Sequence, residues 1–391
     1  MNMKNLTTLC AAFGILASVC AQSPSPGVFI TDRGAHTSIA KPGAPTNIVG
    51  LPRTTHDIHM NTGVKKYGLR YVVAHDPKQP GVAIPGEGYI GMSAPTSCNW
   101  YAGGFFDLRI NGQSIGTTTI HSFVGRSVGN RGQVDLVFDT PQSLVRIRFV
   151  TLVGGDALHC QLLLEPKTEI KSLRLLLRCY PSAFVSKADR HVLTATRDLK
   201  QGERADLDLA EESWLLYYDR IFDAGHASPS GTGRGPCSVL WTGTQADKVG
   251  FTIGNYGFDT VMDLKPSLRE FRFVFFDYKG TKNEAAEADL RARADALLAK
   301  LPTFSFAVDG IASWPLARKR QEIARVLAAM PDERKVAAQY QAWAEELTEQ
   351  LKLVRSGAAG AVMAEAAAAN LIQKWDHGLA DLRLKALLKG I

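Results

Sequence analysis

The side chains best suited to chemistry gather in the segment 219–237, which joins two apolar runs typical of β-strands. It is rich in glycine, proline and serine, and a loop of this length between strands is usually either functional or disordered. We expect Asp219 or Asp223 to act as a general acid or base, with His226 as a proton shuttle. Arg234 would then anchor an anionic group. The alternative is a flexible loop whose charges only meet water.

Three glycines in this loop, Gly231, Gly233 and Gly235, do not have the spacing of a dinucleotide fingerprint, and a strand rather than a helix is expected after them. His56 and His59 are three residues apart, but two histidines at that spacing share a metal only on a helix or turn. The chain around them shows neither pattern, and no third ligand is evident. The sequence therefore predicts no cofactor and no metal site.

Aromatic side chains supply a second set of candidate ligand-binding residues. Trp100 and Tyr101 follow a glycine-rich stretch that contains Glu87, and His159 lies on the polar side of an expected strand. Exposed aromatic rings stack on sugars because one face of a sugar ring carries mainly C–H groups. The alternative is that Trp100 belongs to the core and that His159 is structural.

The first 21 residues have the pattern of a secretory signal peptide. Lys4 precedes an apolar run over 9–19, and Ala21 supplies a small residue at the expected cleavage point. The run is too short to span a bilayer. A lipid-modified Cys20 is the alternative, although Val19 stands where a small residue is expected. We expect a periplasmic or secreted protein with no integral membrane segment after cleavage.

The net charge of +7 comes from basic residues that are interspersed with acids. A nucleic-acid surface would show basic clusters, so no nucleic-acid partner is expected. Four cysteines follow the signal peptide: Cys98, Cys160, Cys179 and Cys237. If the strands around Cys160 and Cys179 formed a hairpin, these two would lie roughly 13 Å apart, too far for a disulfide. Buried free thiols are the favoured interpretation, and export would also permit disulfides.

The chain from 61 to 310 predicts a large antiparallel β-sandwich of the supersandwich type, with roughly a dozen strands. In 173–179, for example, leucines alternate with Arg174 and Arg178, as they do in a strand with one solvated face. Asn111-Gly112 between two alternating runs is a strong hairpin signal. The residues before this domain, 22–60, are expected to form an irregular leader.

Helical periodicity replaces the strand pattern near residue 283. Apolar residues at helical spacing predict one helix near 283–301 and a helical region over 311–391. The last two helices are long and joined by a short link, so they should form an antiparallel hairpin. Trp343 and Trp375 lie on its apolar stripes and should pack inward.

Two functions fit this organisation. The first is an exported sandwich directed at carbohydrates, with glycan binding favoured over glycan modification, through a polar face and the 219–237 loop. It rests on fold-level analogy. The second is a non-catalytic structural or assembly protein of the cell envelope, which docks a protein partner through its C-terminal helices. A sheet face lined with aromatic, aspartate and arginine side chains would favour the first.

Overall fold

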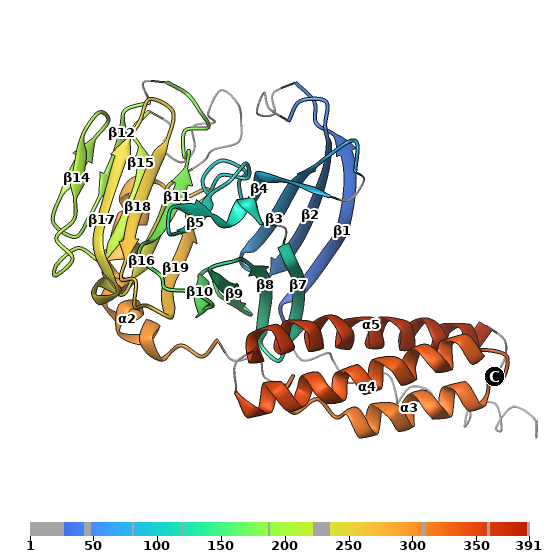
Figure 1. The fold of residues 1–391 in the computed structure, drawn as a ribbon. Coiled ribbons are helices and arrows are strands. Elements are labelled where there is room, and N and C mark those ends of the chain that lie inside the picture. The colour runs from blue at the N-terminus through green and yellow to red at the C-terminus, as the bar shows by residue number, and fades with distance from the viewer. Residues whose placement is uncertain are drawn as a thin grey trace, which may run out of the picture.

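The structure is a computed structural model, and it describes residues 27–42, 48–79, 82–118, 120–186, 188–221, 235–306, 310–357 and 360–388. Two antiparallel β-sheets pack face to face, and helices flank one of them (Figure 1). The predicted fold, a large antiparallel β-sandwich followed by C-terminal helices, is confirmed. The predicted signal peptide lies outside the described residues.

The ten-stranded sheet has the order β1-β2-β3-β4-β5-β11-β18-β17-β14, with the short β6 paired to β5. Its strands are β1 Phe29–Ile39, β2 Pro52–Asn61, β3 Lys66–His75, β4 Ala83–Ala94, β5 Phe106–Ile110, β6 Gln113–Ser114, β11 Leu173–Cys179, β14 Arg204–Asp206, β17 Ala246–Ile253 and β18 Phe258–Leu264. Two of these, β1 and β2, fall where the sequence predicted an irregular leader. That expectation was wrong, because pairing with β3 organises a segment whose own composition does not signal a strand.

The nine-stranded sheet has the order β13-β12-β15-β16-β19-β10-β9-β8-β7. Its strands are β7 Ile120–Val128, β8 Arg131–Asp139, β9 Ser143–Leu152, β10 Leu158–Pro166, β12 Arg190–Leu193, β13 Asp198–Lys200, β15 Trp214–Asp219, β16 Cys237–Trp241 and β19 Glu270–Asp277. The expected hairpin of β10 with β11 does not form, because β10 pairs with β9 and β19 while β11 pairs with β5 and β18. Cys160 and Cys179 therefore lie in opposite sheets, and all four described cysteines are buried free thiols.

The main core lies between the sheets and follows the alternation of each strand. In β11 the side chains of Leu173, Leu175 and Leu177 are buried, while Arg174 is exposed on the other face. The Asn111-Gly112 hairpin also forms: both residues have positive φ, at 52° and 81°, and they connect β5 to β6. Positive φ at both turn positions matches the right-handed twist of the strands, which is why this dipeptide was a good predictor.

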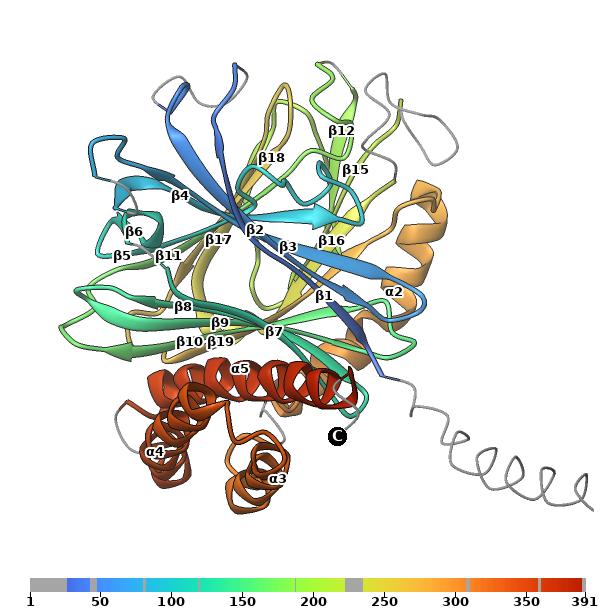
Figure 2. The ribbon, with the colours of Figure 1, turned by 90° about the vertical axis from the view of Figure 1, so that its right-hand side faces the viewer.

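In the described part of the chain, helices pack on the outer face of the nine-stranded sheet in two places. The four helices are α2 Asn283–Lys300, α3 Leu316–Ala328, α4 Arg334–Ser356 and α5 Ala361–Leu388. Helix α2 packs on β15 and β16, and α5 lies against β7 and β8 (Figures 1 and 2). Helices α4 and α5 form the predicted antiparallel hairpin, with α3 packed beside it. Within the described residues, no helix is long and apolar enough to cross a membrane.

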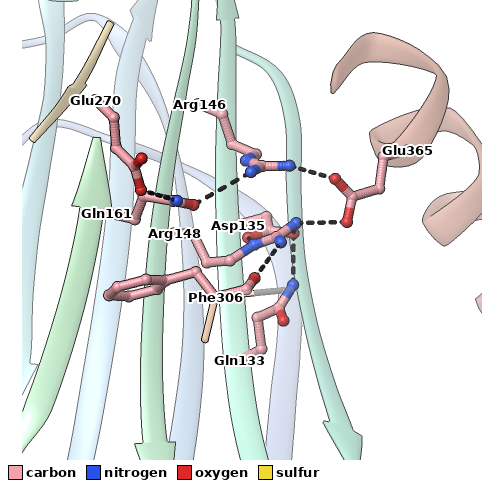
Figure 3. Close-up of polar contacts among 8 residues, drawn as sticks. All are labelled: Gln133, Asp135, Arg146, Arg148, Gln161, Glu270, Phe306 and Glu365. Carbon is pink, nitrogen blue, oxygen red and sulfur yellow. Dashed lines mark hydrogen bonds and ion pairs between the residues drawn. The ribbon is translucent and has the colours of Figure 1, made fainter. Parts of the chain in front are cut away.

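A buried charge network joins α5 to the sheet (Figure 3). Arg148 on β9 donates to both carboxylate oxygens of Asp135, at 2.7 and 2.9 Å, and to Glu365 on α5 at 2.9 Å. It also donates to the carbonyl of Phe306 at 2.7 Å. Arg146 forms a second ion pair with Glu365. Burial alone would raise the pKa of Asp135, but the Arg148 guanidinium outweighs it and holds that pKa below its usual value.

Candidate functional site on the open face of the ten-stranded sheet

The outer face of the ten-stranded sheet carries arginine–aspartate pairs across β5, β11 and β18. Alternation points Arg174 and Arg178 of β11 away from the core. Strand register places Arg174 opposite Asp263 and Arg178 opposite Asp259. Arg174 donates to both oxygens of Asp263, at 2.6 and 3.2 Å, and Arg178 donates to Asp259 at 2.7 Å. These pairs hold planar polar groups in fixed positions on a solvent-facing surface.

A hollow of about 290 Å³ lies at the end of this row, over β4, β5 and β11. Its polar lining includes Asp107, Arg109 and Arg178, and Tyr89 and Leu176 supply apolar surface. Asp107 accepts from Arg109 at 2.9 Å and from the Ser114 hydroxyl. A second hollow, of about 360 Å³, lies further along the same face and is lined in part by the Arg174–Asp263 pair.

Three aromatic side chains pack against one another, and we call them the aromatic cluster: Tyr101, Tyr180 and Phe184. Their ring centroids are 4.3–5.3 Å apart. Both phenols lie within electrostatic range of Arg178, which lines the hollow. Burial raises the pKa of Tyr180 to about 12. The protonated hydroxyl can donate a hydrogen bond at neutral pH.

Two glycines make room for the tyrosine rings. A Cβ added at Gly103 would lie 2.4 Å from the ring of Tyr101, and one added at Gly257 would lie 2.3 Å from the ring of Tyr180. No side chain larger than hydrogen fits at such a distance without a shift of the ring. The backbone at Gly103 and at Gly257 therefore lies directly against these two rings.

Phe184 is exposed on a strained turn. Its φ is +66° and that of Ala183 is +53°, in the left-handed region that bulky residues rarely adopt. Such backbone strain persists only where the surroundings impose it, and it is concentrated at functional sites. The side chain of Phe184 is nevertheless 40% exposed, so burial of its ring does not explain the strain.

The buried Arg190 imposes this turn. It donates to the carbonyl of Val185 and, at 2.6 Å, to the carbonyl of Asn255. The first carbonyl follows Phe184 directly, and the second belongs to the turn beside Gly257. One fully buried guanidinium thus ties together the two turns that carry and support the aromatic cluster.

Asp219, the described member of the predicted catalytic set, lies at the end of β15 and is 3% exposed. Its Cα is the register partner of Arg190, and its charge raises the pKa of that arginine, which burial otherwise lowers. Asp219 therefore helps to neutralise the guanidinium behind the aromatic cluster. Asp223, His226 and Arg234 lie outside the described residues.

The predicted ligand-binding residues separate in the structure. Trp100 is fully buried, and its indole N–H donates to the Phe276 carbonyl at 3.2 Å. Its ring packs in the core between the sheets, which favours the structural alternative and leaves no face for a ligand. Tyr101, the next residue, reaches the opposite side and joins the aromatic cluster. His56 and His59 alternate to opposite faces of β2 and so do not converge.

His159 lies on the other sheet, away from this face. Its ring stacks on Phe304, with centroids 3.9 Å apart and planes 4° apart. Burial lowers its pKa to about 4, assisted by Arg131 and opposed by the carbonyl of Val150 and by Asp156. Phe304 covers one face of the ring, so the structure assigns His159 a packing role.

Replacement of His159 by phenylalanine should reduce the loss of stability in mild acid. The unfolded chain takes up a proton near pH 6.5, whereas folded His159 resists it until about pH 4, so wild-type stability falls as the pH drops through this window. Phenylalanine does not titrate, so the acid-induced loss in the free energy of unfolding should be smaller by roughly 2–3 kcal/mol, while the ring keeps its stack on Phe304. Urea unfolding at pH 5 and pH 7.5 measures the difference. An unchanged pH dependence would show that the imidazole is not held neutral.

Sequence reasoning missed Tyr180, Phe184 and the role of Arg178. Alternation did place Arg178 on the solvated face of its strand. Nothing in the local pattern indicates that residues 180–184 form a left-handed turn, because Arg190 imposes it from a strand in the opposite sheet.

No known protein family matches this chain, and no curated protein is similar to it. Solved structures with partial likeness include an α-N-acetylgalactosaminidase from Bifidobacterium bifidum in complex with GalNAc. It has a TM-score of 0.38 and 10% identity over 76% of this chain and 41% of that one. A GH36 α-galactosidase from Geobacillus stearothermophilus gives a TM-score of 0.31 and 9% identity, over 62% of this chain and 40% of that one.

A chondroitinase AC lyase gives a TM-score of 0.30 and 8% identity, over 60% of this chain and 38% of that one. The chain therefore spans well under half the length of each of these enzymes. At such TM-scores the likenesses do not bear on what this protein does, and its function is inferred from the site alone.

Proposed function

We propose that this protein binds a glycan on the open face of its ten-stranded sheet, after export from the cytoplasm. The observation that carries the proposal is the exposed Phe184, held in a strained turn within the aromatic cluster, whose two tyrosines lie within electrostatic range of the Arg178 that lines the hollow. Aromatic rings match the C–H faces of sugars. The proposal of export depends on the predicted signal peptide. The intact mass of protein recovered outside the cytoplasm tests whether that peptide has been removed.

The polar groups of the face complement the hydroxyl-rich edges of sugars. Asp107 and Asp259 each accept from an arginine, and each carboxylate retains lone pairs that can accept further hydrogen bonds. Arginine and aspartate thus present donors and acceptors side by side, as vicinal hydroxyls require. The two hollows on one face suit an extended chain of sugars more than a single ring.

Substitution of Phe184 by alanine should weaken glycan binding about 5- to 10-fold, which corresponds to the loss of one stacking contact. A glycan array on the full chain identifies the oligosaccharide, and calorimetric titration measures its affinity for wild type and variant. Phe29→Ala is the matched control, because Phe29 is 68% exposed on the distant edge strand β1. The proposal fails if no glycan binds the wild type, or if both variants bind equally well.

A further inference from the structure

A further cavity, of about 580 Å³ and separate from the two hollows of the open face, lies between the nine-stranded sheet and the helices, at the edge where β7 meets α5. This volume is typical of pockets that hold small molecules, and such pockets occur preferentially where separate packing units meet. Its walls come from β1, β7, the segment before α3, and α5. We call it the interface cavity; it shares no residue with the open face.

One wall of the interface cavity is apolar. Ile311 and Trp314 precede α3, and Ile372 lies on α5. Trp314 is 9% exposed, and its ring is fixed by edge contact with Trp375, at a centroid distance of 5.6 Å. A rigid, largely desolvated wall of this kind favours a compact ligand with an apolar face.

Two carboxylates at the rim are already paired. Asp32 bonds to His56 at 2.7 Å and accepts from the Gly34 amide at 2.8 Å. Asp376 is paired with Lys319 at 2.8 Å. Both acids line the cavity, but each already has a basic partner other than Arg126.

Arg126 lines the same cavity and is the cation without a partner there. Within the described parts of the chain it makes no hydrogen bond or ion pair, although its side chain is partly buried. The acids nearest in electrostatic terms, Asp135 and Glu365, are bound by Arg148. Burial lowers the pKa of Arg126; Asp135 and Glu365 oppose this and Arg148 adds to it, and the net effect is a lowered pKa. A partly buried guanidinium without a directly bonded partner is costly, and an entering anion would offset that cost.

We propose that the interface cavity binds a small molecule with one carboxylate, which pairs with the Arg126 guanidinium while the rest of the ligand packs on Ile311, Trp314 and Ile372. A planar guanidinium can donate two parallel hydrogen bonds to a carboxylate. Gln373 on α5 offers a further amide donor at the same cavity. The ligand body is either hydroxylated, as in a sugar acid, or apolar, as in an aromatic acid.

The test uses the full chain and four probes: glucuronate, glucose, benzoate and acetate. We expect glucuronate or benzoate to bind in calorimetric titration and to change the fluorescence of tryptophan, because Trp314 forms the wall. Glucose lacks the carboxylate and should not bind. Acetate should bind more weakly than the ring-bearing acids. Whichever of the two acids binds identifies the body of the ligand, and binding of neither would overturn the proposal.

Arg126→Met should weaken binding of the acid about 10- to 100-fold, as expected when a hydrogen-bonded charge pair is lost. Arg126→Lys keeps the charge without the planar fork and should retain part of the affinity. Arg325→Met, at an exposed position on α3, is the matched control and should bind the acid like wild type. Undiminished binding by Arg126→Met would overturn the proposal. If Arg126→Met fails to fold, the wild type alone still tests the proposal. The proposal would be overturned if the wild type bound acetate or glucose more tightly than it bound both glucuronate and benzoate.

Discussion

Replacement of Arg148 by methionine is expected to lower the free energy of unfolding by about 3–5 kcal/mol at neutral pH. The side chain of Arg148 is 2% exposed, and it pairs with both Asp135 and Glu365. Methionine fills a similar volume but leaves two largely buried carboxylates without this partner, together with the carbonyl of Phe306. Urea unfolding followed by circular dichroism measures the loss.

A matched arginine on the opposite sheet shows what burial contributes to this effect. Arg174 makes a similar bidentate pair with Asp263, but the two side chains are 55% and 36% exposed. Arg174→Met should therefore change the stability by less than about 1 kcal/mol. If the two variants lost equal stability, the network at α5 would be no more than a surface ion pair, and this account would be wrong.

Replacement of Trp375 by alanine should destabilise the helical region by about 3–5 kcal/mol, because it opens a cavity in that region's core. Trp375 is fully buried on α5, and its ring makes edge contacts with Trp314 and Tyr340 at 5.6 and 4.8 Å. Tyr340 also donates its hydroxyl to the Trp375 carbonyl at 3.1 Å. Thermal melting of the helical signal in far-ultraviolet circular dichroism measures the effect.

Trp343 provides the matched control on α4. Its ring is only partly buried and contacts Tyr340 at 5.1 Å, so Trp343→Ala should cost about 1–2 kcal/mol. The prediction that both tryptophans pack inward is confirmed in full for Trp375 and in part for Trp343. A larger loss for Trp343→Ala than for Trp375→Ala would contradict this assignment of the core.

Local pattern predicted the elements of the fold well, for a reason that individual segments make clear. In β11 the alternation of leucine and arginine reports which face is buried, because a strand reverses its side-chain direction at every residue. In α5 the spacing of Leu371, Trp375 and Leu379 reports a buried stripe in the same way. The strand β1 in the leader segment was not predicted, because it is exposed along nearly all of its length and its side chains show no such alternation.

The sites were less predictable, because each is assembled from segments far apart in the chain. Tyr101 was among the predicted ligand-binding residues, but its partners Tyr180 and Phe184 were not. Arg190, on a strand of the opposite sheet, bonds both to the turn that carries Phe184 and to the distant carbonyl of Asn255, and no periodicity predicts that second bond. In the same way, the local sequence does not distinguish Arg126 from any other arginine of a strand. Its position in a cavity depends on the contact between α5 and β7.

The sequence by itself determined the class of fold, the hairpin at Asn111-Gly112 and the change from strands to helices near residue 283. These features depend on residues within one turn or two strand positions of each other. Tertiary structure alone decided that β10 and β11 enter opposite sheets, that Arg178 lines a hollow on the outer face, and that Arg126 lines a cavity beside α5 with no directly bonded partner among the described residues. The physical reason is that strand partners and covering helices are chosen by contacts between distant segments, whereas a local pattern reports only which face of an element is buried.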